Sequence, residues 1–143
     1  MPQNFMYNRA MNKKAKLTII RGLPGSGKST YAKANYKCLI LENDMFHIQN
    51  GAYNYSVNNM KMAILWCKSA CETALSNGMD VVVANTFTKR RFIEVYRQLA
   101  ERYGAEFEVV RCSGNYGNIH DVPKMVLESM KNSFEDWEGE TVV

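Results

Sequence analysis

With 143 residues, the chain has the length of one globular domain, which can bury a hydrophobic core without disulfides or a structural metal. Its composition, 46% hydrophobic and 22% charged, excludes a disordered chain, and no apolar run is long enough to span a membrane. The net charge of +4 comes from the first sixteen residues, which hold four of the 18 basic residues and no acidic one; residues 17–143 therefore carry 14 of each sign. We expect a flexible basic arm over residues 1–15, followed by a single domain over residues 16–143.

From residue 16 onward, the sequence predicts strands and helices in alternation. Short runs rich in apolar and β-branched residues indicate strands, and apolar residues spaced three and four apart indicate helices. The expected strands are 16–21, 38–41, 80–84 and 106–112, and the expected helices are 29–36, 57–77, 89–103 and 123–134. This order predicts a three-layer α/β fold: a parallel sheet of four or five strands, with the first strand inside it, flanked by helices.

Capping residues and apolar faces define the last three helices. Ser56 and Thr88 are suited to cap two of them, and Pro123 suits the first turn of the last. The expected apolar faces are Val57, Met60, Ile64, Cys67, Cys71 and Leu75 in the first, Phe92, Tyr96, Leu99 and Tyr103 in the second, and Val126, Leu127, Met130 and Phe134 in the third. We expect the acidic stretch over residues 135–140 to be solvated.

The segment 22–29 fits the phosphate-binding pattern GxxxxGK[ST] and lies between the first strand and the first helix, the context that this motif requires. Glycine lets consecutive backbone N–H groups point at a phosphate, and the following helix offers its positive end. We expect Lys28 to reach the β and γ phosphates of ATP, Ser29 to ligate Mg²⁺ and Thr30 to touch the α-phosphate. The expected ATP-binding residues are Gly22, Leu23, Pro24, Gly25, Ser26, Gly27, Lys28, Ser29 and Thr30.

Asp44 stands at the carboxyl end of the second strand, on the edge of the sheet where the phosphate loop also emerges. Its carboxylate could accept the proton of an acceptor hydroxyl that attacks the γ-phosphate, or it could cap a short helix over 45–50. His47 could steady a phosphate or the substrate, although a single histidine is more often a surface or packing residue.

At the end of the third strand, Asn85 and Thr86 occupy the place where many ATPases carry an aspartate that organises Mg²⁺. Asp44 or bound water could take over that role, and Asn-Thr also suits a turn. Basic residues open the next helix, although cations there oppose the helix dipole. Arg90 could therefore bind or neutralise phosphate charge, or it could lie in a solvated cluster with its basic neighbours.

Five segments resemble, in this order, those of a family of small P-loop kinases that includes phage polynucleotide kinase and the kinase-like domain of Nedd-four-binding protein two. They are RGLPGSGKST (21–30), ENDMFH (42–47), NGAYNYS (50–56), VVVANTFT (81–88) and GNIHDVP (117–123). The resemblance covers about residues 17–137 and implies transfer of the γ-phosphate of ATP, with Mg²⁺, to a hydroxyl, best known for the 5′-hydroxyl of a polynucleotide. It further implies that Asp44 is a general base and that residues 113–122, which include Asn118, form a lid over the nucleotide.

The chain departs from this family at two positions. The family commonly has arginine where this chain has Gly117, and polynucleotide kinase has arginine where it has His47. Without a cation in the lid, charge on the transferred group would be met by Lys28, Mg²⁺ and Arg111 or Arg90.

Three functions stay open on the sequence. The first is a phosphotransferase that acts on a DNA or RNA hydroxyl, and the second is a kinase for a small molecule such as a sugar, nucleoside or antibiotic, which suits a domain without net charge. The third is an ATP-binding module with little catalytic activity, which Gly117 and Asn85 favour. The four cysteines lack metal-ligand spacing and are expected to be reduced, and without a signal-peptide core we expect a cytoplasmic protein that does not contact a membrane.

Overall fold

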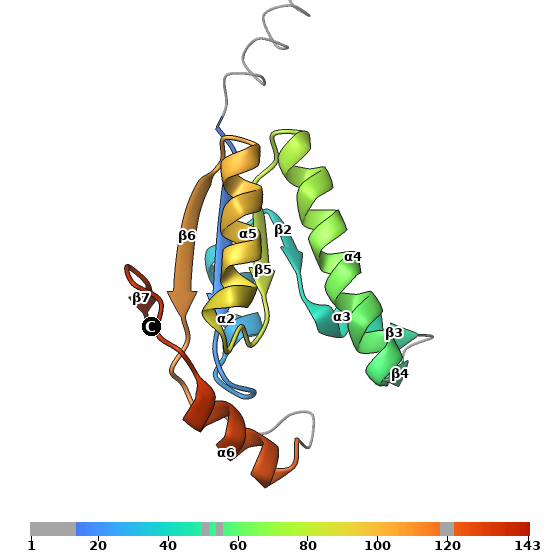
Figure 1. The fold of residues 1–143 in the computed structure, drawn as a ribbon, viewed down its shortest axis with the longest axis vertical. Helices are drawn as coiled ribbons and strands as arrows, with labels where there is room; N and C mark the ends of the chain where they lie inside the picture. Colours follow the sequence, from blue (N-terminus) through green and yellow to red (C-terminus); the bar gives the residue numbers. More distant parts are fainter. Residues whose placement is uncertain (1–13, 50–51, 54–55, 118–121) are drawn as a thin grey trace, which may run out of the picture.

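Five parallel strands form the central sheet of the protein (Figure 1), for which a computed structural model describes residues 14–49, 52–53, 56–117 and 122–143. The strands are β1 (Lys16–Arg21), β2 (Leu39–Leu41), β5 (Val81–Ala84), β6 (Glu106–Arg111) and β7 (Thr141–Val142), in the order β2-β5-β1-β6-β7. In the middle of β1, Ile19 pairs with Val83 on one side and Val109 on the other. The predicted parallel sheet with β1 inside it is confirmed, and the short β7 is its fifth strand.

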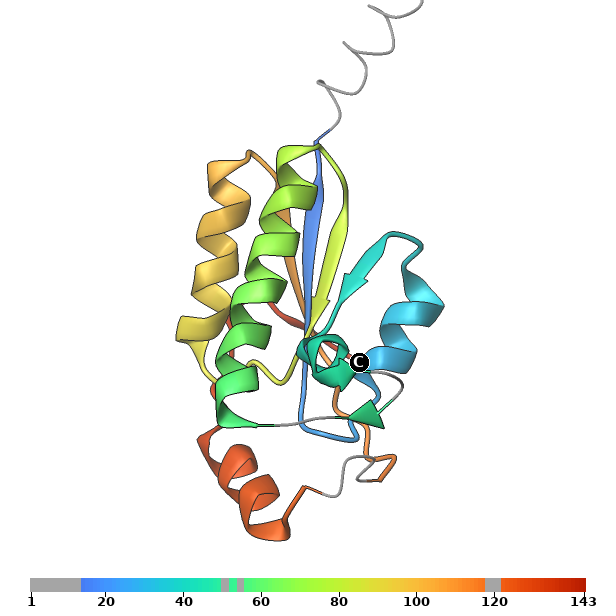
Figure 2. The ribbon, with the colours of Figure 1, turned by 90° about the vertical axis from the view of Figure 1, so that its right-hand side faces the viewer.

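Helices cover both faces of this sheet (Figure 2). α4 (Val57–Ser76) and α5 (Arg90–Arg102) lie on one face and α2 (Lys28–Asn35) on the other, whereas α3 (Asn43–His47) and α6 (Lys124–Ser133) lie beyond the carboxyl edge of the sheet. A short antiparallel pair, β3 (Ile48–Gln49) and β4 (Ala52–Tyr53), lies between α3 and α4. Leu17 and Ile19 face α4 and α5, whereas Ile20 faces α2 together with Val82, so β1 alternates between two apolar cores. The three predicted layers are therefore present.

The cap of α4 is confirmed, but its predicted apolar face is wrong in the first half. Ser56 Oγ accepts a hydrogen bond from the backbone N–H of Asn59 at 3.0 Å. Met60 and Ile64 are 43% and 48% exposed, whereas the buried face begins at Ala63. The first turns of α4 lie beside α3, beyond the end of β2, and therefore do not meet the sheet (Figure 1).

The start of α5 also differs from the prediction. Lys89, and not Thr88, precedes the helix, and its side chain makes no capping hydrogen bond. Instead, the carboxylate of Glu135 accepts a hydrogen bond from the backbone N–H of Arg90 at 2.8 Å. The buried face of the helix begins at Ile93, and Phe92 lies exposed beside it.

The last helix, α6, extends away from the sheet (Figure 1) and has no fully buried residue. Of its predicted apolar face, Leu127, Met130 and Phe134 are half-buried and Val126 is exposed. The four cysteines are free thiols, as expected, and Cys67, Cys71 and Cys112 are buried. Across the described ranges, we find no helix with the length and apolar character of a membrane span.

Candidate functional site

The phosphate loop connects β1 to α2 and depends on glycine for both its backbone angles and its space. Gly25 and Gly27 take left-handed backbone angles (φ 79° and 92°), which residues with a side chain rarely adopt. A Cβ at Gly25 would lie 1.9 Å from the carbonyl oxygen of Gly117. A substitution there would therefore displace the segment that lies on the loop.

Ser26 provides a buried hydroxyl within this loop. The residue is 4% exposed, and its Oγ has no hydrogen-bond partner among the described residues. Such a hydroxyl is costly unless a ligand oxygen or water bonds to it. The loop therefore fits an oxygen-rich anion such as a phosphate.

The ammonium group of Lys28 is held inside the loop. Its Nζ donates hydrogen bonds to the backbone carbonyls of Gly22 at 3.0 Å and Leu23 at 2.9 Å. Burial lowers the pKa of Lys28, and the nearby Cys112, Asp44 and Glu42 oppose this shift. A bound phosphate would also raise the pKa of Lys28, because its negative charge would stabilise the charged ammonium.

Glu42 is a site residue that the sequence analysis did not single out. It follows β2 directly, and its carboxylate accepts a hydrogen bond from the hydroxyl of Ser29. A carboxylate oxygen and a hydroxyl oxygen are ligands that suit Mg²⁺. Its place in the sequence could have indicated this role, because Glu42, like Asp44, follows the predicted second strand at the carboxyl edge of the sheet.

Asp44 lies inside the first turn of α3, so it does not occupy the capping position before a helix. Asn85 holds this turn beside β5: its Oδ1 accepts a hydrogen bond from the Asn43 N–H at 2.8 Å, and its Nδ2 donates to Asn43 Oδ1 at 3.3 Å. The carbonyl of Thr86 accepts a hydrogen bond from the Gly22 N–H at 3.3 Å. The end of β5 thus ties α3 to the phosphate loop.

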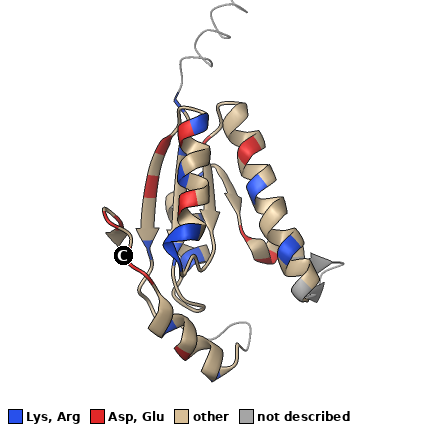
Figure 3. Ribbon diagram, viewed as in Figure 1, with Lys and Arg blue, Asp and Glu red and all other residues tan. Residues whose placement is uncertain are grey.

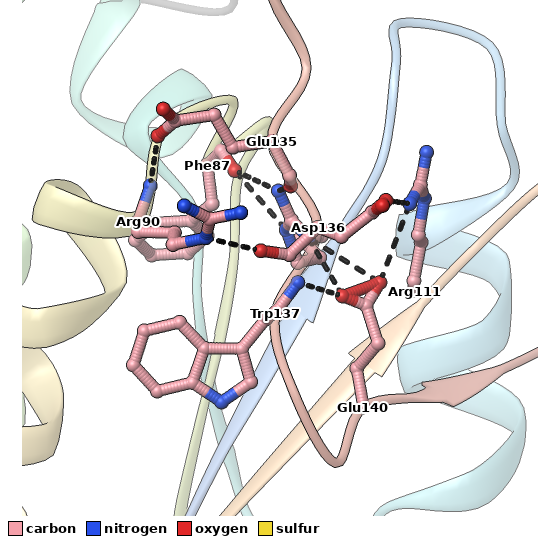
Figure 4. A network of polar contacts seen from close by, with 8 residues as sticks. Phe87, Arg90, Arg111, Glu135, Asp136, Trp137 and Glu140 are labelled. Carbon is pink, nitrogen blue, oxygen red and sulfur yellow. Dashed lines mark hydrogen bonds and ion pairs between the residues drawn. The ribbon is translucent and has the colours of Figure 1, made fainter.

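Three arginines near this edge pair with the segment between α6 and β7 (Figure 4), so the acidic stretch over residues 135–140 is not simply solvated as predicted. Figure 3 shows the basic residues gathered at the start of α5 and the acidic residues of this segment. Arg111 Nη1 lies 2.6 Å from Asp136 Oδ1, and Arg90 Nε donates to the Asp136 carbonyl at 2.7 Å. The prediction missed these partners because they are 25 and 46 positions apart in the chain.

Arg21, the last residue of β1, is the buried centre of this network. It is 0% exposed, and its guanidinium donates to the carbonyls of Phe87 and Glu135 and to the carboxylate of Glu140. Phe87 has a left-handed backbone (φ 45°), a strained angle for a bulky residue, and its carbonyl accepts two of these bonds. The Phe134 ring centroid lies 4.1 Å from the guanidinium carbon of Arg21, which adds a cation–π contact.

The first part of the expected lid lies directly on the phosphate loop. The Tyr116 N–H donates a hydrogen bond to the Gly25 carbonyl at 2.8 Å. Gly117 is exposed, and no described atom lies within 4 Å of the place that a Cβ would take there, so a larger residue has space although the φ of 100° disfavours one. Asn118 and the side chain of His47 lie outside the described part of the structure.

The residues that could bind a metal ion lie in and beside the phosphate loop. No group of three or more His, Cys, Asp or Glu residues suited to a metal occurs among the described residues. Ser29 and Glu42 bring two oxygen donors together beside the loop. Such a pair fits Mg²⁺, which usually binds through one or two protein oxygens together with substrate phosphates and water.

Comparison with known proteins agrees with this architecture. A family model described as an AAA domain matches residues 17–136. The uncharacterized protein PM0531 of Pasteurella multocida (strain Pm70) is 31% identical to the chain, over an alignment that covers 80% of this chain and 73% of that protein.

Several solved structures share the fold. The Pnkp1/Rnl/Hen1 RNA repair complex contains a chain with a TM-score of 0.67 and 19% identity, matched over 86% of this chain and 45% of that chain. Kti12 of Chaetomium thermophilum, in complex with ADP-AlF3, gives a TM-score of 0.64 at 13% identity, over 89% of this chain and 88% of that chain. A sugar kinase of Janibacter sp. HTCC2649, in an unliganded structure, gives 0.62 at 17% identity, over 90% of this chain and 83% of that chain. At these identities the similarity shows the fold alone, which is that of the P-loop kinases.

Proposed function

The chain belongs to the AAA domain family, with the fold of a P-loop kinase, and on this premise we propose that it transfers the γ-phosphate of ATP to a hydroxyl group. One observation carries the proposal: two carboxylates follow β2 at the edge of the sheet where the phosphate loop lies, Glu42, which accepts a hydrogen bond from Ser29 of the loop, and Asp44, in the first turn of α3. Both lie near enough to Lys28 that their charge opposes the lowering of its pKa by burial. A carboxylate beside a phosphate loop is what transfer to a hydroxyl requires, because the hydroxyl must lose a proton as it attacks.

The residues of the chain divide this work. When bound, Mg²⁺ would neutralise charge on the phosphate oxygens, and Ser29 with Glu42 would hold it. Lys28 binds the phosphates through its ammonium group, which the loop carbonyls keep in place. Asp44 accepts the proton of the acceptor hydroxyl, and Asn85 positions the turn that carries Asp44.

The remaining predicted residues keep supporting roles in this proposal. Residues 113–122 form the lid, of which residues 118–121 lie outside the described ranges. Closure of such a lid would exclude water, which competes with the acceptor for the phosphate. His47 is proposed to contact the acceptor, because it ends the helix that begins beside Asp44.

For the acceptor, we propose the 5′-hydroxyl of DNA or RNA. The highest TM-score of the three solved structures above, 0.67, belongs to a chain of an RNA repair complex. A small-molecule acceptor is the second candidate, and the arginine network favours it. Arg90 and Arg111 already pair with the acidic segment, which leaves them less available to the phosphates of a polynucleotide.

The test is transfer of labelled γ-phosphate to 5′-hydroxyl DNA, 5′-hydroxyl RNA and a panel of sugars and nucleosides. Asp44→Asn should lose transfer and keep ATP affinity, because an amide retains the shape but cannot take a proton. The matched control is Asp80→Asn, since Asp80 bonds to the Lys16 N–H at the opposite edge of the sheet.

The outcomes separate the candidates. Transfer to oligonucleotides that Asp44→Asn abolishes supports the first acceptor, and transfer to a sugar or nucleoside alone supports the second. Tight binding of ATP without transfer to any acceptor contradicts a phosphotransferase and identifies a binding module.

A further inference from the structure

Tyr116 is an exposed aromatic residue that rests on the phosphate loop. The residue is 78% exposed, and one edge of its ring lies against Gly27, at the start of α2. A Cβ on Gly27 would lie 2.9 Å from Cε2 of the ring, and a Cβ on Gly114 would lie 2.3 Å from the same atom. Glycine at both positions therefore leaves the space that the ring occupies.

Backbone hydrogen bonds attach the segment that carries this ring to the phosphate loop and to the sheet. The Tyr116 N–H donates to the carbonyl of Gly25 at 2.8 Å, and the Cys112 N–H donates to the carbonyl of Arg21 at 2.8 Å. The segment that carries the ring is thus attached on both sides, to the phosphate loop and to the end of β1. Because one ring edge is covered and most of the residue is exposed, the ring has an open face for a planar ligand.

The strand order determines which part of a nucleotide this face would meet. β1 and its loop lie in the middle of the sheet; β2 leads to Glu42 and Asp44 on one side, and β6 leads to Tyr116 on the other (Figure 1). In the proposed reaction the γ-phosphate must lie toward Asp44. The opposite end of the ligand, its nucleoside, then extends toward the side of β6.

We propose that Tyr116 stacks on the base of the bound nucleotide and gives affinity without choosing among bases. This inference rests on the proposed function, because it takes the ligand of the phosphate loop to be a nucleoside triphosphate. Stacking uses the π-face that every base has and does not read the hydrogen-bonding edge. ATP and GTP should therefore bind with similar affinity, and the phenol hydroxyl should contribute little.

The experiment is calorimetric titration of the full chain with Mg²⁺ and ATP, GTP or inorganic tripolyphosphate. Tyr116→Ala should weaken the binding of ATP and of GTP by about 5- to 150-fold, the range that loss of one base–aromatic stack gives, and should leave the binding of tripolyphosphate unchanged. Tyr116→Phe should match the wild type because it keeps the ring. Phe92→Ala is the matched control, since Phe92 is also an exposed aromatic residue but lies on the surface of α5.

Each alternative outcome overturns a specific statement. If Tyr116→Ala weakens ATP and tripolyphosphate equally, or changes neither, then the ring does not contact the base. If the wild type binds tripolyphosphate as tightly as ATP, stacking contributes nothing and the inference also fails. If ATP binding depends on Tyr116 but no phosphate is transferred to any acceptor, the inference stands and the proposed transfer fails.

Discussion

Arg21 and Glu140, 119 positions apart in the chain, form a buried ion pair with 2.9 Å between Nη1 and Oε2. The arginine side chain is 0% exposed and the glutamate side chain 7%. Burial lowers the pKa of Arg21, and the charge of Glu140 opposes that shift. This pair attaches the C-terminal segment to the central strand.

Glu140→Gln should destabilise the fold strongly, because it leaves the guanidinium of Arg21 buried without its countercharge. Removal of one partner of a buried pair typically costs about 3–5 kcal/mol. The measurement is the urea midpoint at constant slope, with the exposed Glu138→Gln as control. A midpoint equal to that of the control would show that the carbonyls of Phe87 and Glu135 suffice to hold the arginine.

Glu135→Gln should lower the thermal midpoint in a pH-dependent way. The hydrogen bond from the Arg90 N–H, with help from neighbouring basic charges, lowers the pKa of Glu135. A carboxyl group with a lowered pKa in the folded state stabilises above its unfolded pKa, about 4.3, and this contribution disappears as the pH falls through the folded pKa. Wild type and variant should therefore differ at pH 7 and converge only when the pH falls below the lowered pKa of Glu135, which lies under the unfolded value of about 4.3. If the two thermal midpoints differ by the same amount at every pH, the charge of the Glu135 carboxylate does not contribute to stability.

Lys28→Ala should abolish phosphate transfer and leave the fold intact. The ammonium group bonds to two carbonyls of its own loop, so its loss affects the ligand site more than the core. We expect transfer to fall by at least about 10²-fold, the typical loss for one charged or hydrogen-bonding group at such a site. Circular dichroism checks the fold, and Lys33→Ala, an exposed lysine on α2, is the control. Near wild-type transfer by Lys28→Ala would contradict the role of the loop.

Glu42→Gln should weaken the binding of a divalent cation together with ADP. An amide is a poorer ligand than a carboxylate and changes the hydrogen bond that orients Ser29. We expect the Mn²⁺ dissociation constant, measured by electron paramagnetic resonance with ADP present, to rise by about 10-fold or more. The control is Glu106→Gln, because Glu106 begins β6 at the edge of the sheet away from the phosphate loop. If the Mn²⁺ affinity is unchanged, Glu42 is not a metal ligand, and its role is the hydrogen bond with Ser29.

The buried thiols should resist modification in the folded protein. Burial raises the pKa of Cys67 and of Cys71 to about 12, and Cys38 is only half-buried. At pH 8, Ellman's reagent should react first with Cys38, and with the buried thiols only on unfolding. Because the folded pKa is raised, the protonated thiols stabilise the fold below about pH 8.5, and this contribution is lost as the pH rises toward 12. Rapid reaction of all four thiols at pH 8 would contradict this packing.

Local sequence patterns were sufficient to predict the parallel sheet, the phosphate loop and the family. Strand 16–21, the GxxxxGK[ST] motif and the cap at Ser56 each depend on neighbours a few positions away, so their sequences carry the information. The faces of the helices were less certain, because they depend on where the sheet ends. Ile64 fits the helical spacing of the buried residues but lies exposed, because the buried face of α4 passes through Ala63 and Cys67 at that point.

The arginine network could not be read from such patterns. The partners of Arg21 are 66 to 119 positions away, and no local spacing relates a basic residue to acids at that distance. One signal was present: Arg21 ends a strand whose other buried positions are mostly apolar, and a charge in that position requires a partner. The same network explains the basic first turn of α5, because the carboxylate of Glu135 bonds to its first N–H group.

The two attachments on either side of α6 are unequal. Before the helix, the chain is held to the phosphate loop by the hydrogen bond from Tyr116 to Gly25; after it, the chain is held by the buried pair of Arg21 and Glu140. A single backbone hydrogen bond contributes about 1 kcal/mol net, much less than the cost of breaking the ion pair. Of these two described attachments, the hydrogen bond to the loop is the weaker, so a movement of α6 would break it first and leave the C-terminal segment in place. Such a movement would free the segment before α6 from the phosphate loop, where a nucleotide would enter and leave.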